Sequence, residues 1–423
     1  MKFSLVVTAL ALVLALGRVL CAAEGTTPPA APYGGISEKI HTTALDWFDN
    51  YLKQNKPDEL VPVAEAIADC LIAGGNLYAA GDPAFCDEWN FRAGGLAGTK
   101  IYSGQRMEKN DVLIIGLLSP GDKGARNFST GPVVGGYGNL TQALTVHIGS
   151  RQWPQVSRLS EMVNKERWKN GIYFLDTNAP EGDSWDAVAL GQMSSLAVAW
   201  ALDAEIIAAV SRKGKTAAVL GSIFEPGASE YDEKIKGKLI LDEPKLEPIA
   251  AGKLSREYLS ACRRQIAAFV AGGQAQQLRA AAARVAACQR RKGVIWTVTE
   301  GHVHARGAIV PGELTRLIVS GPSWMWEAPQ GLKTGDLLLF IGYLKFPTEA
   351  VDKSVKAGAD AAVVVADDGP NDDHVTTVHS SWEKWDGVVS VPGYPYKAVP
   401  SSAILTTLHW YAIMAEAQEL LKK

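Results

Sequence analysis

An internal repeat is the feature that most constrains how this chain can fold. Residues 36–75 and 254–293 align without a gap at an offset of 218. The identical pairs include Ser37/Ser255, Cys70/Cys288 and Gly75/Gly293, and apolar positions match between them. In each copy, apolar residues first recur at helical spacing and a short apolar strand then follows. We therefore expect two similar halves.

Both copies continue with further apolar strands and close with a long helix. The predicted strands begin at Asn76, Asp111, Leu144 and Gly171 in the first copy, and at Val294, Asp336, Ala361 and Gly387 in the second. The closing helices are predicted over 194–210 and 401–422. Helices that alternate with buried strands indicate an α/β fold with parallel sheets. We predict a first domain over 36–224, a charged linker over 225–253 and a second domain over 254–423.

The N-terminus has the features of an export signal. Lys2 precedes an apolar run over 3–17, and small residues follow at 21–23. This pattern predicts a signal peptide over 1–22 and a flexible, Pro-rich lead-in over 23–35. The alternatives are a buried N-terminal helix and an uncut anchor. Cleavage predicts a periplasmic or extracellular protein whose mature form has no membrane segment.

Charge and cysteine content narrow the choice of partners. The net charge is −3, so no broad basic field favours nucleic acid. Four cysteines follow the signal; we favour free thiols over the bridges Cys70–Cys86 and Cys262–Cys288. Asp372, Asp373 and the nearby histidines fit no standard metal-ligand spacing. We predict no cofactor and no metal.

Three short motifs resemble those of the sugar isomerase (SIS) domain family. Residues 88–96 read EWNFRAGGL, residues 301–304 read GHVH, and residues 176–183 form a polar loop after a strand. The first two resemble stretches of phosphosugar-binding proteins, and the Glu88/Arg92 spacing resembles that of phosphoheptose isomerases. The resemblance spans residues 36–423. It implies two tandem flavodoxin-like SIS domains that pack as an internal pseudo-dimer, with a further homo-oligomer expected.

The resemblance also implies site residues. The catalytic candidates are Glu88, His302 and His304. The candidates for ligand binding are Gly81, Asp82, Arg92, Ser119, Gly121, Asp176, Asp183, Glu313 and Ser401. Each has a plainer interpretation. Glu88 and Arg92 are four residues apart, as in an ordinary helical salt bridge, and Asp176 and Asp183 suit a turn.

The expected phosphate loop departs from the family pattern. Ser119-Pro-Gly121-Asp122 has one hydroxyl, and the Asp122 carboxylate would repel a phosphate. This counts against phosphate binding and leaves two ligand classes open, a phosphosugar and an unphosphorylated sugar or cell-wall fragment. Three functions remain open: an exported sugar-binding protein, an aldose–ketose isomerase acting between C1 and C2, and a structural or interaction protein with degenerate pockets. The first two can coexist in one molecule.

Overall fold

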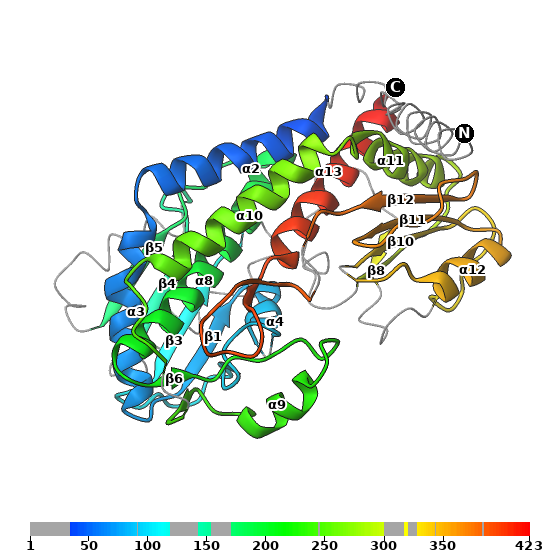
Figure 1. The fold of residues 1–423 in the computed structure, drawn as a ribbon. Coiled ribbons are helices and arrows are strands. Elements are labelled where there is room, and N and C mark those ends of the chain that lie inside the picture. The colour runs from blue at the N-terminus through cyan, green and yellow to red at the C-terminus, as the bar shows by residue number, and fades with distance from the viewer. Residues whose placement is uncertain are drawn as a thin grey trace, which may run out of the picture. The chain divides into compact units, whose positions relative to one another are not determined.

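Two five-stranded parallel β-sheets organise the chain (Figure 1). The structure, a computed structural model, describes residues 34–90, 92–118, 143–153, 171–243, 246–299, 317–319, 328–342, 344–382 and 385–423. Gly34–Lys423 forms one compact unit, so the boundary predicted at 225–253 stays a prediction.

The first sheet has the strand order β2-β1-β3-β4-β5, and all its neighbouring strands are parallel. Its strands are β1 (Leu77–Gly81), β2 (Lys100–Ile101), β3 (Val112–Gly116), β4 (Leu144–Gly149) and β5 (Ile172–Asp176). β3 and β4 are buried along their whole length, as expected of central strands in a parallel sheet. The order is that of flavodoxin-like folds, which confirms the predicted fold class.

The second sheet repeats this topology. Its strands are β8 (Ile295–Thr299), β9 (Leu317–Val319), β10 (Leu337–Ile341), β11 (Asp360–Val365) and β12 (Val375–His379). They lie in the order β12-β11-β10-β8-β9, again all parallel. Read from β9, this order again places the second strand first, then the first, third, fourth and fifth.

The repeat extends to the helices. α3 (Pro57–Ile72) and α11 (Ala275–Arg290) are separated by the same 218 residues as the two sequence copies, and so are β1 and β8. α2 (Ile36–Lys53) corresponds to α10 (Lys253–Ala271). The structure therefore carries the duplication at the level of whole elements.

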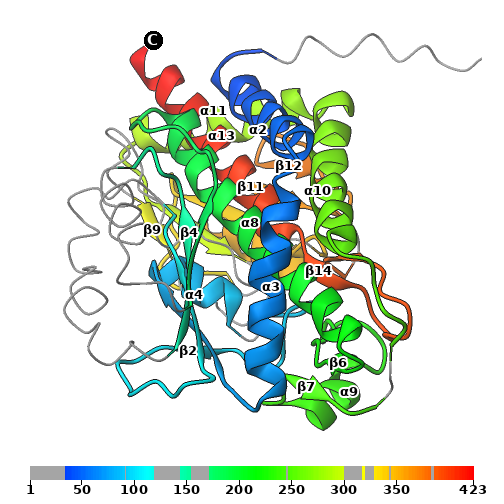
Figure 2. The same cartoon turned by 90° about the vertical axis from the view of Figure 1, so that its left-hand side faces the viewer.

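Helices cover the sheets. α3 and α8 (Trp185–Arg212) pack against strands of the first sheet (Figure 2). α11 packs on the second sheet, and α12 (Thr348–Lys356) packs on its other face, where Ala350 and Val351 meet Leu338 and Phe340. Each sheet thus has an apolar core of its own.

Helices of the two copies also pack on one another. α13 (Ser402–Lys422) lies against α11, α8 and α2, and α10 lies against α8 and α2. Among the described residues, α8 is the one helix long and apolar enough to cross a membrane, and its most apolar window is entirely buried in the protein. Such burial is typical of a core helix, and it joins the two halves through helix–helix contacts.

Two sequence predictions need correction. The strand predicted at Gly387 is β13 (Gly387–Val389), but it pairs antiparallel with β14 (Ala398–Pro400) outside the second sheet. The fifth strand of that sheet is β12, which the sequence analysis missed. Both segments are largely buried, so burial does not distinguish the strand that joins the sheet from the one that does not.

The segment 225–253 also has structure of its own. It contains α9 (Ala228–Ile235) and β7 (Ile240–Leu241), which pairs antiparallel with β6 (Thr216–Ala217). The remaining short helix, α4 (Pro83–Trp89), follows β1 directly. Its start places several predicted site residues at the carboxyl edge of the first sheet.

Candidate functional site

The carboxyl end of β1 holds the predicted ligand residues Gly81 and Asp82. Gly81 has a φ of +105°, and a Cβ there would lie 2.2 Å from the backbone oxygen of Gly116. Only glycine tolerates both conditions. The Asp82 carboxylate accepts a hydrogen bond from the Ala84 backbone N–H at 2.9 Å and so caps α4. Both residues therefore shape the strand-to-helix turn.

Asp176 ends β5 at the same edge of the first sheet. Its Oδ1 accepts hydrogen bonds from the backbone N–H groups of Asn178, at 2.9 Å, and Arg151, at 3.2 Å. This is the turn-forming arrangement of the plainer interpretation. Asp183 is exposed just ahead of α8. A role for either residue in ligand binding stays a prediction.

Glu88 and Arg92 lie together in a buried polar network. Glu88 is 0% exposed and Arg92 is 3% exposed. Glu88 Oε1 lies 3.5 Å from Arg92 Nε and accepts a hydrogen bond from Trp200 Nε1 at 3.2 Å. The Arg92 guanidinium also pairs with Asp386 and contacts the Ser402 hydroxyl. Because the carboxylate is enclosed and ion-paired, this geometry favours a structural role for Glu88 over that of a proton-transferring base.

Asp386 links this network to the start of α13. Its Oδ1 accepts from the backbone N–H groups of Ser401 at 3.1 Å and Ser402 at 2.7 Å. A carboxylate at a helix N-terminus satisfies free N–H groups and complements the helix dipole. Three predicted site residues, Glu88, Arg92 and Ser401, thus meet at one place. The other candidates, His302, His304, Ser119, Gly121 and Glu313, lie outside the described residues.

A second buried network joins α2, α13 and the end of β12. His41 Nδ1 lies 2.9 Å from the Ser37 backbone oxygen, which can only accept, so His41 carries its proton on Nδ1. His41 Nε2 then accepts from His409 Nδ1 at 3.1 Å. His409 Nε2 in turn accepts from the Ser380 hydroxyl at 3.1 Å.

Burial keeps this histidine pair neutral. Loss of hydration lowers the pKa of His41 to about 4 and holds that of His409 well below its usual value. Phe269 packs on both rings, with centroid distances of 5.0 Å to His41 and 4.2 Å to His409. Both rings are neutral, and the hydrogen bonds run in one direction, from Ser380 through His409 to His41 and the Ser37 backbone oxygen. Such a network can be buried where the two copies pack.

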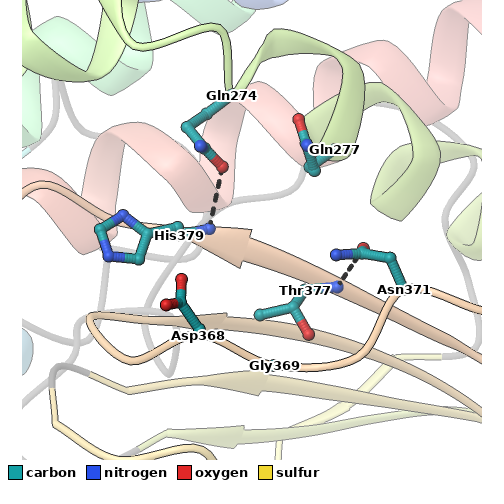
Figure 3. A pocket seen from close by; sticks show the side chains of 7 residues that line it. All are labelled: Gln274, Gln277, Asp368, Gly369, Asn371, Thr377 and His379. Atoms are coloured by element: carbon teal, nitrogen blue, oxygen red, sulfur yellow. Dashed lines mark hydrogen bonds between the residues drawn. The ribbon is translucent and has the colours of Figure 1, made fainter. Parts of the chain in front are cut away.

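An open polar pocket lies at the β12 edge of the second sheet (Figure 3). This edge pocket encloses about 120 Å³ and is lined by Gln274, Gln277, Asp368, Gly369, Asn371, Thr377 and His379. The glutamines come from the start of α11, and the loop between β11 and β12 supplies the residues opposite (Figure 3). These residues are about a hundred positions apart in sequence, so no local motif marks the site and the sequence analysis missed it.

Side chains around the edge pocket also protect β12. Thr377 N–H donates to Asn371 Oδ1 at 2.9 Å, and His379 N–H donates to Gln274 Oε1 at 3.2 Å (Figure 3). Next to the pocket, Val375 N–H donates to Asp372 Oδ1 at 2.8 Å. Alternate outward N–H groups of an edge strand are thereby covered, which removes a surface for strand addition. The Gln277 Oε1 atom is shielded from solvent and has no hydrogen-bond partner among the described residues.

The described part of the chain shows neither a disulfide nor a cluster of metal-ligating side chains. Cys70, Cys86, Cys262 and Cys288 are free, as favoured from the sequence. Burial raises the pKa of Cys86 and Cys262 to about 12, so these thiols are poor nucleophiles near neutral pH. No described group of three or more His, Cys, Asp or Glu residues could hold a metal ion.

No protein-family model matches this chain, and no curated protein matches it in sequence. Several solved structures are similar in fold. A protein from Salmonella typhimurium LT2, provisionally named a sugar binding protein, has 11% identity and a TM-score of 0.47; the alignment covers 91% of this chain and 98% of that one. A provisionally named phosphosugar isomerase from Silicibacter pomeroyi DSS-3 has 12% identity and a TM-score of 0.45, with coverages of 91% and 98%.

A third structure, from Clostridium difficile 630, also carries the provisional name of a phosphosugar isomerase. It has 11% identity and a TM-score of 0.47, and the alignment covers 92% of this chain and 93% of that one. These values are too low to transfer a ligand or a reaction. The function has to be inferred from the residues of this chain.

Proposed function

We propose that this protein binds an unphosphorylated carbohydrate, or a similar polyhydroxylated compound, in the edge pocket without converting it. The observation that carries the proposal is the lining of that pocket, in which three side-chain amides stand beside one carboxylate, one hydroxyl, one imidazole and a glycine. Amides offer both donors and acceptors, and so do sugar hydroxyls.

The charge of the edge pocket supports a ligand without phosphate. Its lining residues include no Lys or Arg, and Asp368 supplies its one carboxyl group. A phosphate is ordinarily held by guanidinium or ammonium groups, and a carboxylate opposes it. The volume of the cavity is well below the roughly 300–1,000 Å³ of pockets that hold drug-sized ligands. The expected occupant is therefore one small sugar unit or part of one.

The state of Glu88 supports binding rather than isomerisation. A base that moves a proton between C1 and C2 needs contact with the substrate. The Glu88 side chain is instead enclosed beside Arg92 and Trp200. Export is part of the proposal, because phosphorylated sugars are mostly kept inside cells. It rests on the predicted signal peptide over 1–22.

A thermal-shift titration of the full chain tests the proposal. The panel contains free hexoses, amino sugars and the matching sugar phosphates. Unphosphorylated sugars are expected to raise the Tm, since a ligand at a hundred times its Kd stabilises by about 2.7 kcal/mol. Gln277→Leu keeps the side-chain size and removes the amide, so the rise should disappear. Gln276→Leu is the matched control, because Gln276 is exposed and does not line the pocket.

Other outcomes decide against the proposal. A rise confined to phosphorylated sugars would show that the phosphate is recognised after all. A rise that survives Gln277→Leu would place the ligand elsewhere. If no sugar shifts the Tm, the protein is better described as a structural or interaction protein.

A further inference from the structure

A second cavity lies between α10 and β13, away from the edge pocket. We call it the arginine groove. It encloses about 470 Å³, a volume suited to an organic ligand. Arg256, Ser260 and Arg264 lie along one stripe of α10, because residues four apart share a helix face. Val388, Val389 and Ser390 face them.

The two arginines differ in how they are held. Arg256 forms an ion pair with Asp58 of α3. A Cβ on Gly252 would lie 2.2 Å from Arg256 Nη1, so the guanidinium packs directly against this glycine. Arg264 is exposed, and within the described ranges it makes no hydrogen bond or ion pair. The groove thus combines one guanidinium fixed in place with one that is free to bind.

The groove has one further charged lining residue, Glu257. Glu257 lies 3.9 Å from Lys253, measured from Oε1 to Nζ. Glu257 is the one carboxylate among the residues that line the groove, and Arg256 and Arg264 supply two positive charges there. Guanidinium groups form strong, often bidentate hydrogen bonds with carboxylates and phosphates. The hydroxyls of Ser260 and Ser390 add further donors.

From this geometry we infer that the arginine groove binds an organic anion, a carboxylate or a phosphate ester, whose acid group lies on Arg256 and Arg264. The rest of the ligand would lie against residues 388–390, which line the opposite side of the groove. The inference is independent of the sugar proposed for the edge pocket.

Isothermal titration of the full chain at low salt tests this inference. The probes are benzoate and phenyl phosphate, with benzamide and phenol as their uncharged counterparts. Anions are expected to bind and the uncharged compounds are not, and added salt should weaken binding. Benzoate alone would assign the site to carboxylates, and phenyl phosphate alone would assign it to phosphate esters.

Variants on α10 locate the binding. Arg264→Gln should weaken anion binding about tenfold, the loss expected when one charge-assisted hydrogen bond is removed. Arg264→Lys should recover part of it. Arg263→Gln is the matched control, because the neighbouring Arg263 is bound to Asp49 and does not line the groove. Equal losses in the two Gln variants, equal binding of benzoate and benzamide, or no binding of either anion would overturn the inference.

Discussion

The two sheets share one strand order, yet their carboxyl ends are used differently. In the first sheet, the edge is filled by packed side chains. A Cβ on Gly116 would lie 2.1 Å from the Phe85 ring, and Glu88 is enclosed beside Arg92. In the second, Ile341 stands at the end of the third strand in place of Gly116, and a polar cavity opens beside β12. The two copies therefore share a scaffold, while the residues at the carboxyl ends of their strands have diverged.

The largest expected effect is a loss of stability when the buried ion network of Glu88, Arg92 and Asp386 is broken. Arg92→Met leaves Glu88 and Asp386 without their shared cation. Breaking a buried pair in this way is expected to lower the free energy of unfolding by about 3–5 kcal/mol. The measurement is urea denaturation. Arg263→Met breaks a pair with Asp49 on the surface and should cost at most about 1 kcal/mol. Similar losses in the two variants would show that burial does not distinguish the pairs.

The next effect is a pH dependence from the histidine pair between the copies. Because the pKa of His41 is lowered to about 4 in the folded state, the unfolded chain binds a proton first as pH falls. Stability should be constant above about pH 7 and decline from about pH 6.5 toward pH 4, with roughly 3 kcal/mol lost through His41. His409, also lowered, adds to the decline in the same direction.

Denaturation at several pH values checks this dependence. His41→Gln should make the decline between about pH 6.5 and pH 5 shallower, even if the variant is less stable at neutral pH. Part of the decline should remain, because burial also lowers the pKa of His409 and lowers that of His147 to about 4. His374→Gln is the control, because the His374 side chain is 64% exposed. Identical profiles in the wild type and the His41 variant would assign the decline to other groups.

A smaller effect tests the packing at the end of β3. Gly116→Ala brings a methyl group against the Phe85 ring and should cost about 1–3 kcal/mol. The second variant Phe85→Leu, added to Gly116→Ala, should recover part of the loss because it removes the clashing ring. Additive losses in the double variant would mean that Phe85 is not what restricts this position.

The smallest expected effect concerns the hydrogen bond between Asn371 and the Thr377 N–H, at the β12 edge of the second sheet. Asn371→Ala removes the acceptor of the Thr377 N–H and should cost about 1 kcal/mol. Hydrogen exchange at the Thr377 amide should become faster, while Asn371→Asp, which keeps the acceptor, should leave it slow. Unchanged exchange in the Ala variant would show that this side chain does not protect the strand.

Much of the fold could be predicted from the sequence, because the repeat and the apolar strands are local signals. The third strands, beginning after Asp111 and Asp336, lie where expected. β12 was missed because an edge strand with polar residues at Thr376, Thr377 and His379 lacks a continuous apolar pattern. Residues 387–389 have that pattern, but they join a hairpin instead.

The sites were less accessible to sequence reasoning. The Glu88/Arg92 spacing correctly indicates a pair, but Asp386, which completes the network, lies 294 residues from Arg92. The edge pocket combines Gln274 with Asp368 and Thr377, and amides at a helix start have no distinctive spacing. The Arg92–Asp386 contact depends on how the two copies pack, and the edge pocket depends on how α11 packs beside β12 within the second copy. A local sequence pattern encodes neither.

The helix packing between the copies has a consequence for the integrity of the chain. α2 from the first copy lies against α10 and α13 from the second, and α13 is buried from Ser402 to Ala415. A protease cut within 225–253 would leave two fragments whose exposed apolar helices are complementary. The nicked protein would remain associated and would denature as a single cooperative unit. Produced separately, the fragments would behave as the obligate subunits of a heterodimer.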